Sequence, residues 1–512
     1  MDGSANITFP ILSLSIFIPI ISAILIQFLR GEKGRNIGEK IVLATILFEG
    51  IIILILASSD IFGGEYQFVE KYQWIPFFNI NYFIGIDSIS FILLALTVIV
   101  YLIALNVSKK EDSAGLHKIK HTCFLVSFSG IIGVFLAIDT ILLYLFWEMV
   151  IVPAFVLLRL FAEKDNHKVS LKFILYSLTG SVVMLAGFIF ISLLYQSENY
   201  ELSFSLIDWY QFTIPAEAAP ALFLAFFLTF AIKVPIFPFH GWMPSSYTNA
   251  PMSLTIIMSG VLSKMGIYGI IRILLPLFSQ LSQSYFSSFL WLVIIGSIYA
   301  SLIAISSKSP KKILAYSSMA HLGIVVYGFF TLNSEAIWGS FFQTFNHGII
   351  SAALFFGLSV IATKCETNNY KSIQGIWKHL PVISSFFFIF TLAGVAFPGT
   401  SSFVAELSIF TGGYRTEPLL TFVAALTTIF SSIYMFNLVR VVIFGMPSPT
   451  VESAMKTGSV ISIEEMFVFA LLTAVIATLG IYPNLFNHLI ESNFSGYIND
   501  FISSKTPIGK LL

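Results

Sequence analysis

The chain has 512 residues, of which 57% are hydrophobic and only 11% charged, and its 27 lysines and arginines balance its 27 aspartates and glutamates. Soluble proteins carry about 25% charged residues, so this composition excludes a soluble enzyme, a disordered scaffold and a nucleic-acid-binding protein with a basic face. A helical membrane protein that crosses the bilayer many times remains.

Fourteen apolar runs of about 20 residues follow one another along the chain, and each is long enough to cross the hydrocarbon layer as a helix. They lie at approximately 10–29, 40–58, 83–106, 119–137, 140–161, 170–195, 219–240, 250–275, 288–306, 312–331, 336–362, 380–411, 418–445 and 463–487. The polar stretches 59–82, 196–218 and 445–462 are expected to be connectors. The sequence therefore predicts an all-α polytopic protein, folded as a single membrane domain over 1–512.

Basic residues in the short loops predict the orientation in the membrane. Loops one, three, five, nine and eleven are basic, with Arg30, Lys33, Arg35, Lys40, Lys109, Lys110, Lys118, Lys120, Lys164, Lys168, Lys172, Lys308, Lys311, Lys312, Lys364, Lys371 and Lys378. The even-numbered loops are neutral or acidic, with Asp60, Glu65, Glu70, Glu198, Glu201, Asp208 and Glu217. We therefore expect the odd loops to face the cytoplasm and both termini to lie on the opposite side.

Two of the runs are interrupted near their middle. The seventh contains Lys233, Pro235 and Pro238, and the twelfth contains Pro398-Gly399 followed by Glu406. Paired broken helices are typical of inverted repeats that place an ion path at the centre of the membrane. Proline and glycine are also common in ordinary membrane helices, so this pattern alone leaves the repeat open.

Ionisable residues deep inside the apolar runs are the candidates for chemistry. They are Glu148, Lys233, Lys264, His321, His347 and Glu406. Each costs about 2.5–3.5 kcal/mol to insert, so we expect these groups to pair, to bind water, or both. Arg159, Arg272 and Arg440 lie near the ends of runs and are expected to be anchors that reach toward the membrane surface.

Residues four apart share one face of a helix. This spacing joins Ser317 with His321, Gln343 with His347 and Ser351, and Ser402 with Glu406. Such stripes can hold a file of water along which a proton moves, and we expect Ser402 to be a partner of Glu406. Structural alternatives stay open: a histidine can merely join helices, and a carboxylate can merely satisfy a broken helix.

Glu148 and Lys233 form a candidate switch. Moving opposite charges apart from about 4 Å, at an effective dielectric constant near 20, changes their energy by up to about 4 kcal/mol. A pair that opens and closes can thus load and unload a proton, although an ion pair that only locks two helices is the alternative.

The sequence shows no metal-ligand cluster, nucleophile triad or nucleotide-binding glycine motif. Its two cysteines, Cys123 and Cys365, lie far apart, which excludes a disulfide framework and a cysteine-bound zinc or iron–sulfur site. Any driving energy is therefore expected to come from outside this chain.

Four motifs together resemble the antiporter-like membrane subunits of respiratory complex I, over nearly the whole chain. They are Lys233-Val-Pro-Ile-Phe-Pro-Phe-His240-Gly-Trp-Met-Pro, Leu262-Ser-Lys264, Lys311-Lys312-Ile-Leu-Ala-Tyr-Ser-Ser-Met-Ala-His321-Leu-Gly and Phe397-Pro-Gly-Thr-Ser-Ser-Phe-Val-Ala-Glu406. At the position of Glu406, the chain resembles the one family member that has glutamate there. The other members, and the related subunit of multisubunit Na+/H+ antiporters, have lysine at this position.

The resemblance implies two inverted five-helix repeats, at 119–275 and 288–445, between three N-terminal spans (1–118) and a last span (463–487). It also implies one proton pathway, in which Glu148 pairs with Lys233, Lys264 is the central lysine, His321 and His347 connect it onward, and Glu406 precedes the exit. The sequence departs from the family pattern at Ser245, Tyr247 and Asn249 and at Ser401-Ser402, which puts the cytoplasmic entrance in doubt.

Two functions remain open. The favoured one is a proton-translocating subunit of NADH:quinone oxidoreductase in the bacterial inner membrane, driven by redox chemistry elsewhere. NADH, FMN, iron–sulfur clusters and quinone would then belong to other subunits, and the partners would be other complex I membrane subunits, including the antiporter-like neighbours L and N. The alternative is a cation/proton antiporter subunit, which exchanges ions without electron transfer. A solute transporter is a weaker third possibility, because the sequence shows no separate polar site for a solute.

Overall fold

A computed structural model of the chain describes residues 10–59, 66–111, 115–163, 166–278, 281, 283–455 and 461–489. Asp60, Glu65 and Lys164, which contributed to the predicted orientation, lie outside the described residues, as do both termini.

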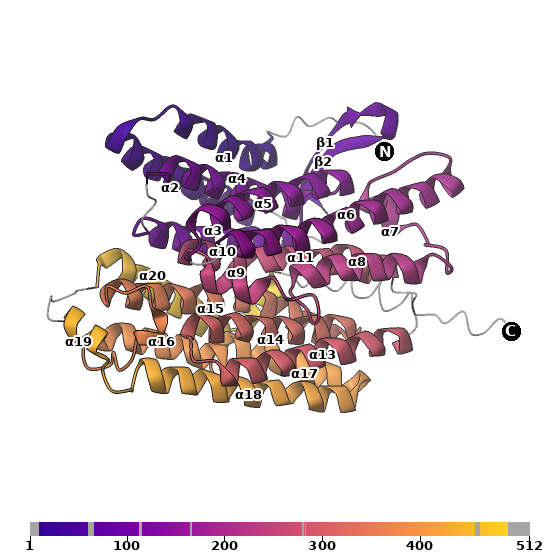
Figure 1. The fold of residues 1–512 in the computed structure, drawn as a ribbon. Coiled ribbons are helices and arrows are strands. Elements are labelled where there is room, and N and C mark those ends of the chain that lie inside the picture. Colours follow the sequence, from indigo (N-terminus) through magenta and orange to yellow (C-terminus); the bar gives the residue numbers. More distant parts are fainter. Residues whose placement is uncertain are drawn as a thin grey trace.

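Long helices packed side by side make up most of the molecule, with the N-terminal helices at the top of Figure 1 and the C-terminal ones at the bottom. The N-terminal part contains α1 (Ile11–Gln27), α2 (Gly31–Ala57), α3 (Ser88–Ser108), α4 (His117–Leu136), α5 (Thr140–Phe161), α6 (Asn166–Asn199), α7 (Leu206–Tyr210), α8 (Ala219–Lys233), α9 (Met243–Asn249), α10 (Met252–Ile257), η2 (Met258–Leu262), α11 (Ser263–Gly269), η3 (Ile270–Leu274) and α12 (Leu275–Phe278). The C-terminal part contains α13 (Gln283–Ser306), α14 (Pro310–Phe330), α15 (Ser334–Lys364), η4 (Tyr370–Ser372), α16 (Pro381–Gly394), α17 (Ser401–Thr416), α18 (Pro418–Val442), α19 (Pro449–Met455), α20 (Ile463–Ile481) and α21 (Asn484–His488).

Eleven helical segments among the described residues are long and apolar enough to cross a membrane, so the chain is a multi-pass membrane protein. Three shorter apolar helices, α1, α8 and α16, accompany them. Each of the fourteen apolar runs of the sequence overlaps one or more of these helices. The count of fourteen spans stays a prediction, because α8 and α16 are long enough to cross only in combination with the helices after their breaks.

The expectation of an all-helical chain is wrong in one place, because a hairpin of two antiparallel strands, β1 (Gln67–Ile75) and β2 (Ile80–Ile86), precedes α3. Strand β2 occupies the first residues of the run that we expected to be helical from residue 83. The hairpin also holds the helices next to it. Glu70 of β1 accepts a hydrogen bond from the amide of Leu12 in the first turn of α1, at 3.0 Å, where helix N–H groups lack helical partners.

Both interrupted runs are broken helices in the structure. Helix α8 ends at Lys233, just before Pro235 and Pro238, and helix resumes at Met243. Proline lacks the N–H group that would continue the helix. Likewise α16 ends at Gly394 and α17 begins at Ser401. Between them lies Gly399 with φ +93°, a conformation that glycine adopts without strain. Each break leaves irregular backbone, which a membrane protein tolerates only inside the protein or beside water.

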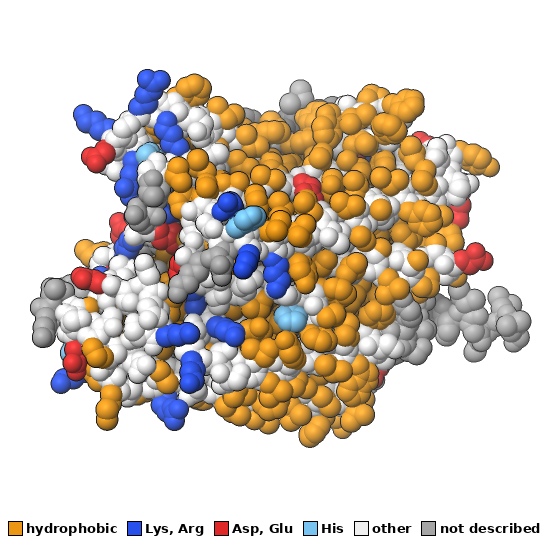
Figure 2. Space-filling model, viewed as in Figure 1, with side chains coloured by type: hydrophobic (Ala, Val, Ile, Leu, Met, Phe, Trp, Pro, Cys, Tyr) orange, Lys and Arg blue, Asp and Glu red, His pale blue; other side chains and the backbone are white. Residues whose placement is uncertain are grey.

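The two ends of the molecule differ in charge, as the loop pattern predicts. On the face shown in Figure 2, lysine and arginine side chains gather on the left, and the right end carries acidic side chains. The end at which α3, α5 and α15 finish and α4, α10 and α14 begin is here called the basic end.

Candidate functional site

Lys264 and His347 meet in the interior of the helix bundle. Lys264, on α11, has no exposed surface, and its Nζ lies 2.9 Å from Nδ1 of His347 on α15. The same Nζ donates to the backbone carbonyl of Ser259 at 2.5 Å. The lysine therefore has polar partners despite complete burial.

The local backbone explains this geometry. The segment that carries Lys264 passes through the π-helical turn η2 immediately before it, and a π turn shifts hydrogen bonding to residues five apart. Ser259 lies five residues before Lys264, and its carbonyl is reached by the lysine side chain. Short π-helical segments inside α-helices are frequent at functional sites.

His321 and Glu406 form the second contact of the site. Nδ1 of His321, on α14, lies 3.0 Å from Oε1 of Glu406 on α17. Gln343 Nε2 donates to the same carboxylate oxygen at 3.2 Å, and the hydroxyl of Thr428 donates to Oε2 at 3.4 Å. Glu406 is 4% exposed. Three helices thus supply partners to one buried carboxylate.

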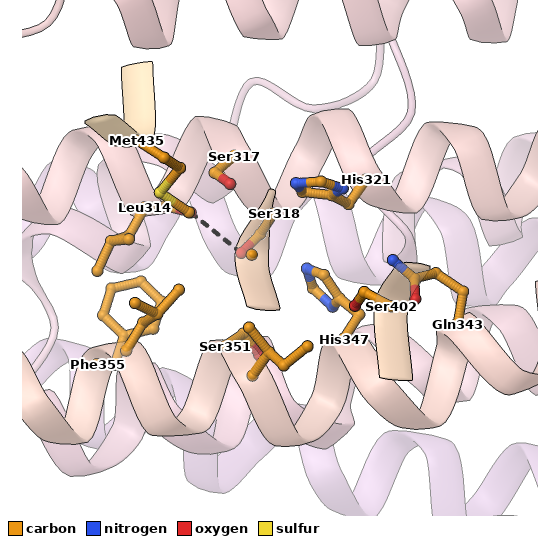
Figure 3. A pocket seen from close by; sticks show the side chains of 13 residues that line it. Leu314, Ser317, Ser318, His321, Gln343, His347, Ser351, Phe355, Ser402 and Met435 are labelled. Carbon is orange, nitrogen blue, oxygen red and sulfur yellow. Dashed lines mark hydrogen bonds between the residues drawn. The ribbon is translucent and has the colours of Figure 1, made fainter. Parts of the chain in front are cut away.

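A small cavity joins these two contacts. The rings of His321 and His347 are 6.2 Å apart between centroids, and both line a cavity with about 20 Å³ of space for water centres. A buried water needs about 10–15 Å³ by this measure and two to four polar partners. Figure 3 shows the hydroxyls of Ser317, Ser351 and Ser402 around this space. The cavity is therefore large and polar enough to hold a water between the two histidines.

The predicted stripes meet at this cavity. Its lining includes every member of the three stripes except Glu406 itself: Ser317, His321, Gln343, His347, Ser351 and Ser402. The expected hydrogen bond between Ser402 and Glu406 is wrong, since the partners of the carboxylate are His321, Gln343 and Thr428. The helical spacing found the shared face, but it could not find partners on other helices.

Glu148 and Lys233 lie in a separate part of the molecule, on α5 and α8. Nζ of Lys233 is buried and lies 5.2 Å from the centre of the Trp147 ring. Among the described residues, neither this Nζ nor Oε1 of Glu148 has a hydrogen-bond partner. The two charges interact electrostatically but form no direct ion pair. The two groups are thus not in direct contact in this structure, and their role as a switch stays a prediction.

Gly266 brings the two parts of the site together. A Cβ atom at this position of α11 would lie 2.6 Å from Cγ2 of Val234 and 3.0 Å from Cβ of Lys233. Only glycine allows α11 to pack this closely on the end of α8. Lys264, two residues earlier on α11, is thereby held near the lysine of the broken helix.

Arg272 does not behave as predicted. Instead of reaching toward the membrane surface, it is 1% exposed, and its guanidinium donates to Asp87 Oδ1 at 2.5 Å and to Ser90 Oγ at 3.2 Å. Its position near a helix end suggested snorkelling, but Asp87 is 185 residues away in the sequence and was not visible as a partner. Arg159 and Arg440 are exposed, and their role as anchors stays a prediction.

Glu49 is a further buried carboxylate that was not among the predicted site residues. It lies in the apolar run of α2, is 1% exposed, and one carboxylate oxygen has no hydrogen-bond partner among the described residues. A charged group deep in an apolar run is costly to insert into the membrane, and this criterion identified the other six residues. The same criterion applies to Glu49 and would have identified it. Charged pairs at the basic end, such as Lys311 with Glu163, were also missed, because their members had been assigned to solvated loops.

The positions that depart from the family pattern make ordinary contacts. Tyr247 is fully buried, and its hydroxyl donates to the carbonyl of Met258 at 2.9 Å. Ser245 donates to the carbonyl of Trp242, and Asn249 donates to the carbonyl of Ser245. Within the described part of the chain, no group of three or more His, Cys, Asp or Glu side chains is placed to hold a metal ion.

Comparison of the sequence with known proteins identifies a family and relatives that cover most of the chain. The transmembrane family described as NADH:quinone oxidoreductase/Mrp antiporter matches residues 137–432. NADH-quinone oxidoreductase subunit M of Rickettsia conorii is 35% identical over 445 residues, which cover 85% of this chain and 88% of the relative.

Solved structures share the fold. A chain of respiratory complex I from Thermus thermophilus superposes with a TM-score of 0.83 at 22% identity, covering 95% of this chain and 99% of that chain. A chain of the Mrp complex from Dietzia superposes with a TM-score of 0.73 at 19% identity, covering 96% of each. At these identities the likeness concerns the fold alone, so it does not separate the two complexes.

Proposed function

The chain belongs to the NADH:quinone oxidoreductase/Mrp antiporter family and, within it, to the group of NADH-quinone oxidoreductase subunit M, and from this membership we propose that it is a proton-translocating membrane subunit of an NADH:quinone oxidoreductase. The observation that carries the proposal is the buried series of contacts Lys264–His347 and His321–Glu406, joined by a cavity with room for water.

The proton path that we propose has two parts. In the first, the side chains of Glu148 and Lys233 move together and apart, which changes the net charge next to the broken helix. In the second, Lys264, His347, His321 and Glu406 pass a proton along the contacts described above. Buried ionisable groups of this kind are the usual sign of a proton relay in membrane proteins, and each can hold or release a proton without leaving its helix.

Electrostatics gives a reason for coupling the two parts. Two unit charges about 8 Å apart, at an effective dielectric constant near 20, interact by about 2 kcal/mol. A proton on Lys233 thus makes a proton on a nearby lysine less favourable. When Glu148 moves toward Lys233 it shields that charge, and Lys264 can take up a proton; when it moves away, Lys264 is driven to release it toward His347.

A cation/proton antiporter subunit is the second candidate, favoured by the likeness in fold to the Mrp complex. The sequence relative at 35% identity favours the first function, because its name is that of an NADH-quinone oxidoreductase subunit. The two candidates differ in whether transport needs Na+ or K+ and whether it follows NADH oxidation.

The remaining assignments follow from the same proposal. NADH, FMN, iron–sulfur clusters and quinone are held by other subunits, and the neighbours in the membrane include the antiporter-like subunits L and N. The chain lies in the bacterial inner membrane with its basic end toward the cytoplasm and both termini on the periplasmic side. Residues 119–275 and 288–445 form two inverted repeats, a proposal supported by the two broken helices.

Proton pumping by the whole reconstituted complex tests the proposal. Lys264→Ala is expected to lower the number of protons moved per NADH oxidised, because the central group of the relay is lost. Lys312→Ala is the matched control, since Lys312 is exposed and lies outside the relay. Acidification of liposomes is measured with a pH-sensitive dye beside NADH oxidation, with and without Na+. Unchanged protons per NADH in Lys264→Ala would reject the relay, and pumping that requires Na+ would favour the antiporter.

A further inference from the structure

A second, larger cavity at the basic end takes no part in the relay described so far. It offers about 400 Å³ of space for water centres, against about 20 Å³ in the relay cavity. Its lining is mixed: apolar residues such as Val107, Phe161 and Met252 alternate with polar and charged ones, namely Lys110, Glu111, Lys120, Glu163, Ser359, Thr363, Glu366, Thr367, Asn368 and Tyr370. Thr363 and Glu163 are exposed, so the cavity opens to solvent at this end.

Ion pairs hold the walls of this basic-end cavity. Glu111 pairs with Lys120 at 3.1 Å and also accepts a hydrogen bond from the hydroxyl of Ser253 at 2.6 Å. Glu163 pairs at 3.2 Å with Lys311, whose side chain is 1% exposed. These charges favour water in the cavity, because ions without hydration or partners are costly to bury.

One face of α15 runs from the relay to this cavity. Residues four apart lie above one another on a helix, and the face consists of Gln343, His347, Ser351, Phe355, Ser359 and Thr363. The first four line the relay cavity, and the last two line the basic-end cavity. Phe355 is the one apolar member of this face. In Figure 3 its ring lies at the end of the relay cavity away from Gln343.

The neighbouring helix shows a similar arrangement. The segment α10–η2–α11 packs against α15 and carries the buried hydroxyls of Thr255, Ser259 and Ser263, again four residues apart. Pro251, four residues before Thr255, lines the basic-end cavity, and Lys264 follows Ser263. Hydroxyl groups on both helices thus lie along the region between the basic-end cavity and the relay cavity.

Two aromatic rings occupy that interval. Phe355 is fully buried, and its ring lies 6.3 Å from the ring of Tyr247, edge to face. The Tyr247 hydroxyl is held by the carbonyl of Met258 in η2, whereas a phenylalanine ring forms no such hydrogen bond, so Phe355 is held by packing alone.

We propose that the basic-end cavity is the vestibule from which protons enter the relay, and that the side chain of Phe355 is the gate between the two. The inference rests on the proposed function. Ser351 and Ser359 are eight residues apart, which corresponds to about 12 Å along the helix, and a file of a few waters spans that distance. An apolar constriction between two wet compartments blocks such a file by excluding water, as in the hydrophobic gates of channels.

The gate has a clear use in a pump. If the relay were always open to the vestibule, protons taken up by Lys264 would flow back each time the pathway opened to the other side. A ring that admits water only in one state of the cycle prevents this return.

Labelling of single cysteines tests the vestibule without relying on activity. In the whole complex with Cys123→Ser and Cys365→Ser, we introduce Thr363→Cys, Ser359→Cys or Ser351→Cys and add a small cationic methanethiosulfonate reagent. Thr363→Cys is the positive control at the mouth. We expect Ser359→Cys to be labelled at a similar rate and Ser351→Cys at least tenfold more slowly. Equal labelling of the two serine positions would overturn the gate, and absence of labelling at Ser359→Cys would overturn the vestibule.

Proton leak tests the gate directly. In liposomes that contain the assembled complex, Phe355→Ser is expected to let an imposed pH difference decay at least threefold faster than in the wild type, and to halve the gradient sustained by NADH oxidation. Phe355→Leu, which keeps an apolar plug, should resemble the wild type. The gate would be rejected if the assembled Phe355→Ser complex showed the same decay of the pH difference and sustained the same gradient as the wild type.

These outcomes are separable from those that concern the proposed function. If Lys264→Ala lost pumping and Phe355→Ser showed no faster proton leak than the wild type, the relay would be supported and the gate would be rejected. Normal pumping in Lys264→Ala would reject the relay, and the gate would be rejected as well because it depends on the relay.

Discussion

Arg272 is a buried cation whose role follows from its contacts. Its guanidinium bonds Asp87 and Ser90 and lies 5.1 Å from the centre of the Tyr268 ring. Asp87 in turn caps α3 by accepting the amide hydrogen of Ser90 at 2.9 Å. The arginine therefore ties the eighth apolar run to the start of α3, and these partners are not members of the proposed relay.

The first prediction concerns this ion pair. Arg272→Met should destabilise the assembled complex by about 3–5 kcal/mol, because it leaves the Asp87 carboxylate buried without its cation. Thermal dissociation of the chain from the complex, followed by native gel electrophoresis, measures the effect. The double variant Arg272→Met with Asp87→Asn is the control, since it removes both charges and should recover most of the loss. Equal stability of Arg272→Met and the wild type would contradict the structural role.

At this scale the sequence predicts which residues are buried better than which residues they contact. The insertion cost of a charge identified the six relay candidates from residue type and position alone. Their partners come from distant helices: Glu406 is contacted by His321 and Gln343, which lie 85 and 63 residues away. Nothing in the local pattern around Ser402 or Arg272 distinguishes a local from a distant partner, and both expectations were wrong for this reason.

Helices are predicted well at the scale of elements because a run of about 20 apolar residues has few alternatives in a membrane. The prolines of the seventh run and the glycine of the twelfth likewise indicate where the helices break. The hairpin β1–β2 was missed because its first strand lies in a stretch that we had assigned to a connector and its second strand continues into an apolar run. The π turn η2 was missed as well, because no residue pattern in Met258–Leu262 marks it.

The second prediction concerns the packing of α11 on α8. Gly266→Ala should lower protons moved per NADH by at least half of the share that this subunit contributes, because the new Cβ would meet Val234 Cγ2 at 2.6 Å and push α8, with Lys233, away from α11. Pumping by the reconstituted complex is the measurement. Adding Val234→Ala removes the atom in the way and should restore much of the activity. If the double variant pumped no better than Gly266→Ala, the close approach of these helices would not be the cause.

The proposed relay extends across both halves of the molecule, from α5 and α8 to α14, α15 and α17. Lys233 and Glu406 stand near its two ends, on helices α8 and α17. Their connection depends on the chain of Lys264, His347 and His321 between them. A single path and two independent paths therefore predict different behaviour when both ends are changed at once.

The third prediction uses that difference. Lys233→Ala removes the charge that responds to Glu148, and Glu406→Gln keeps a hydrogen-bonding side chain but removes the group that holds the proton. Each should lower protons per NADH by the share that this subunit contributes, while NADH oxidation by the uncoupled, assembled complex continues. The double variant should pump no worse than either single one, because a path blocked at one end gains no further block at the other. Losses that add would instead mean that the two halves move protons separately, and the single relay from Lys233 to Glu406 would have to be divided into two.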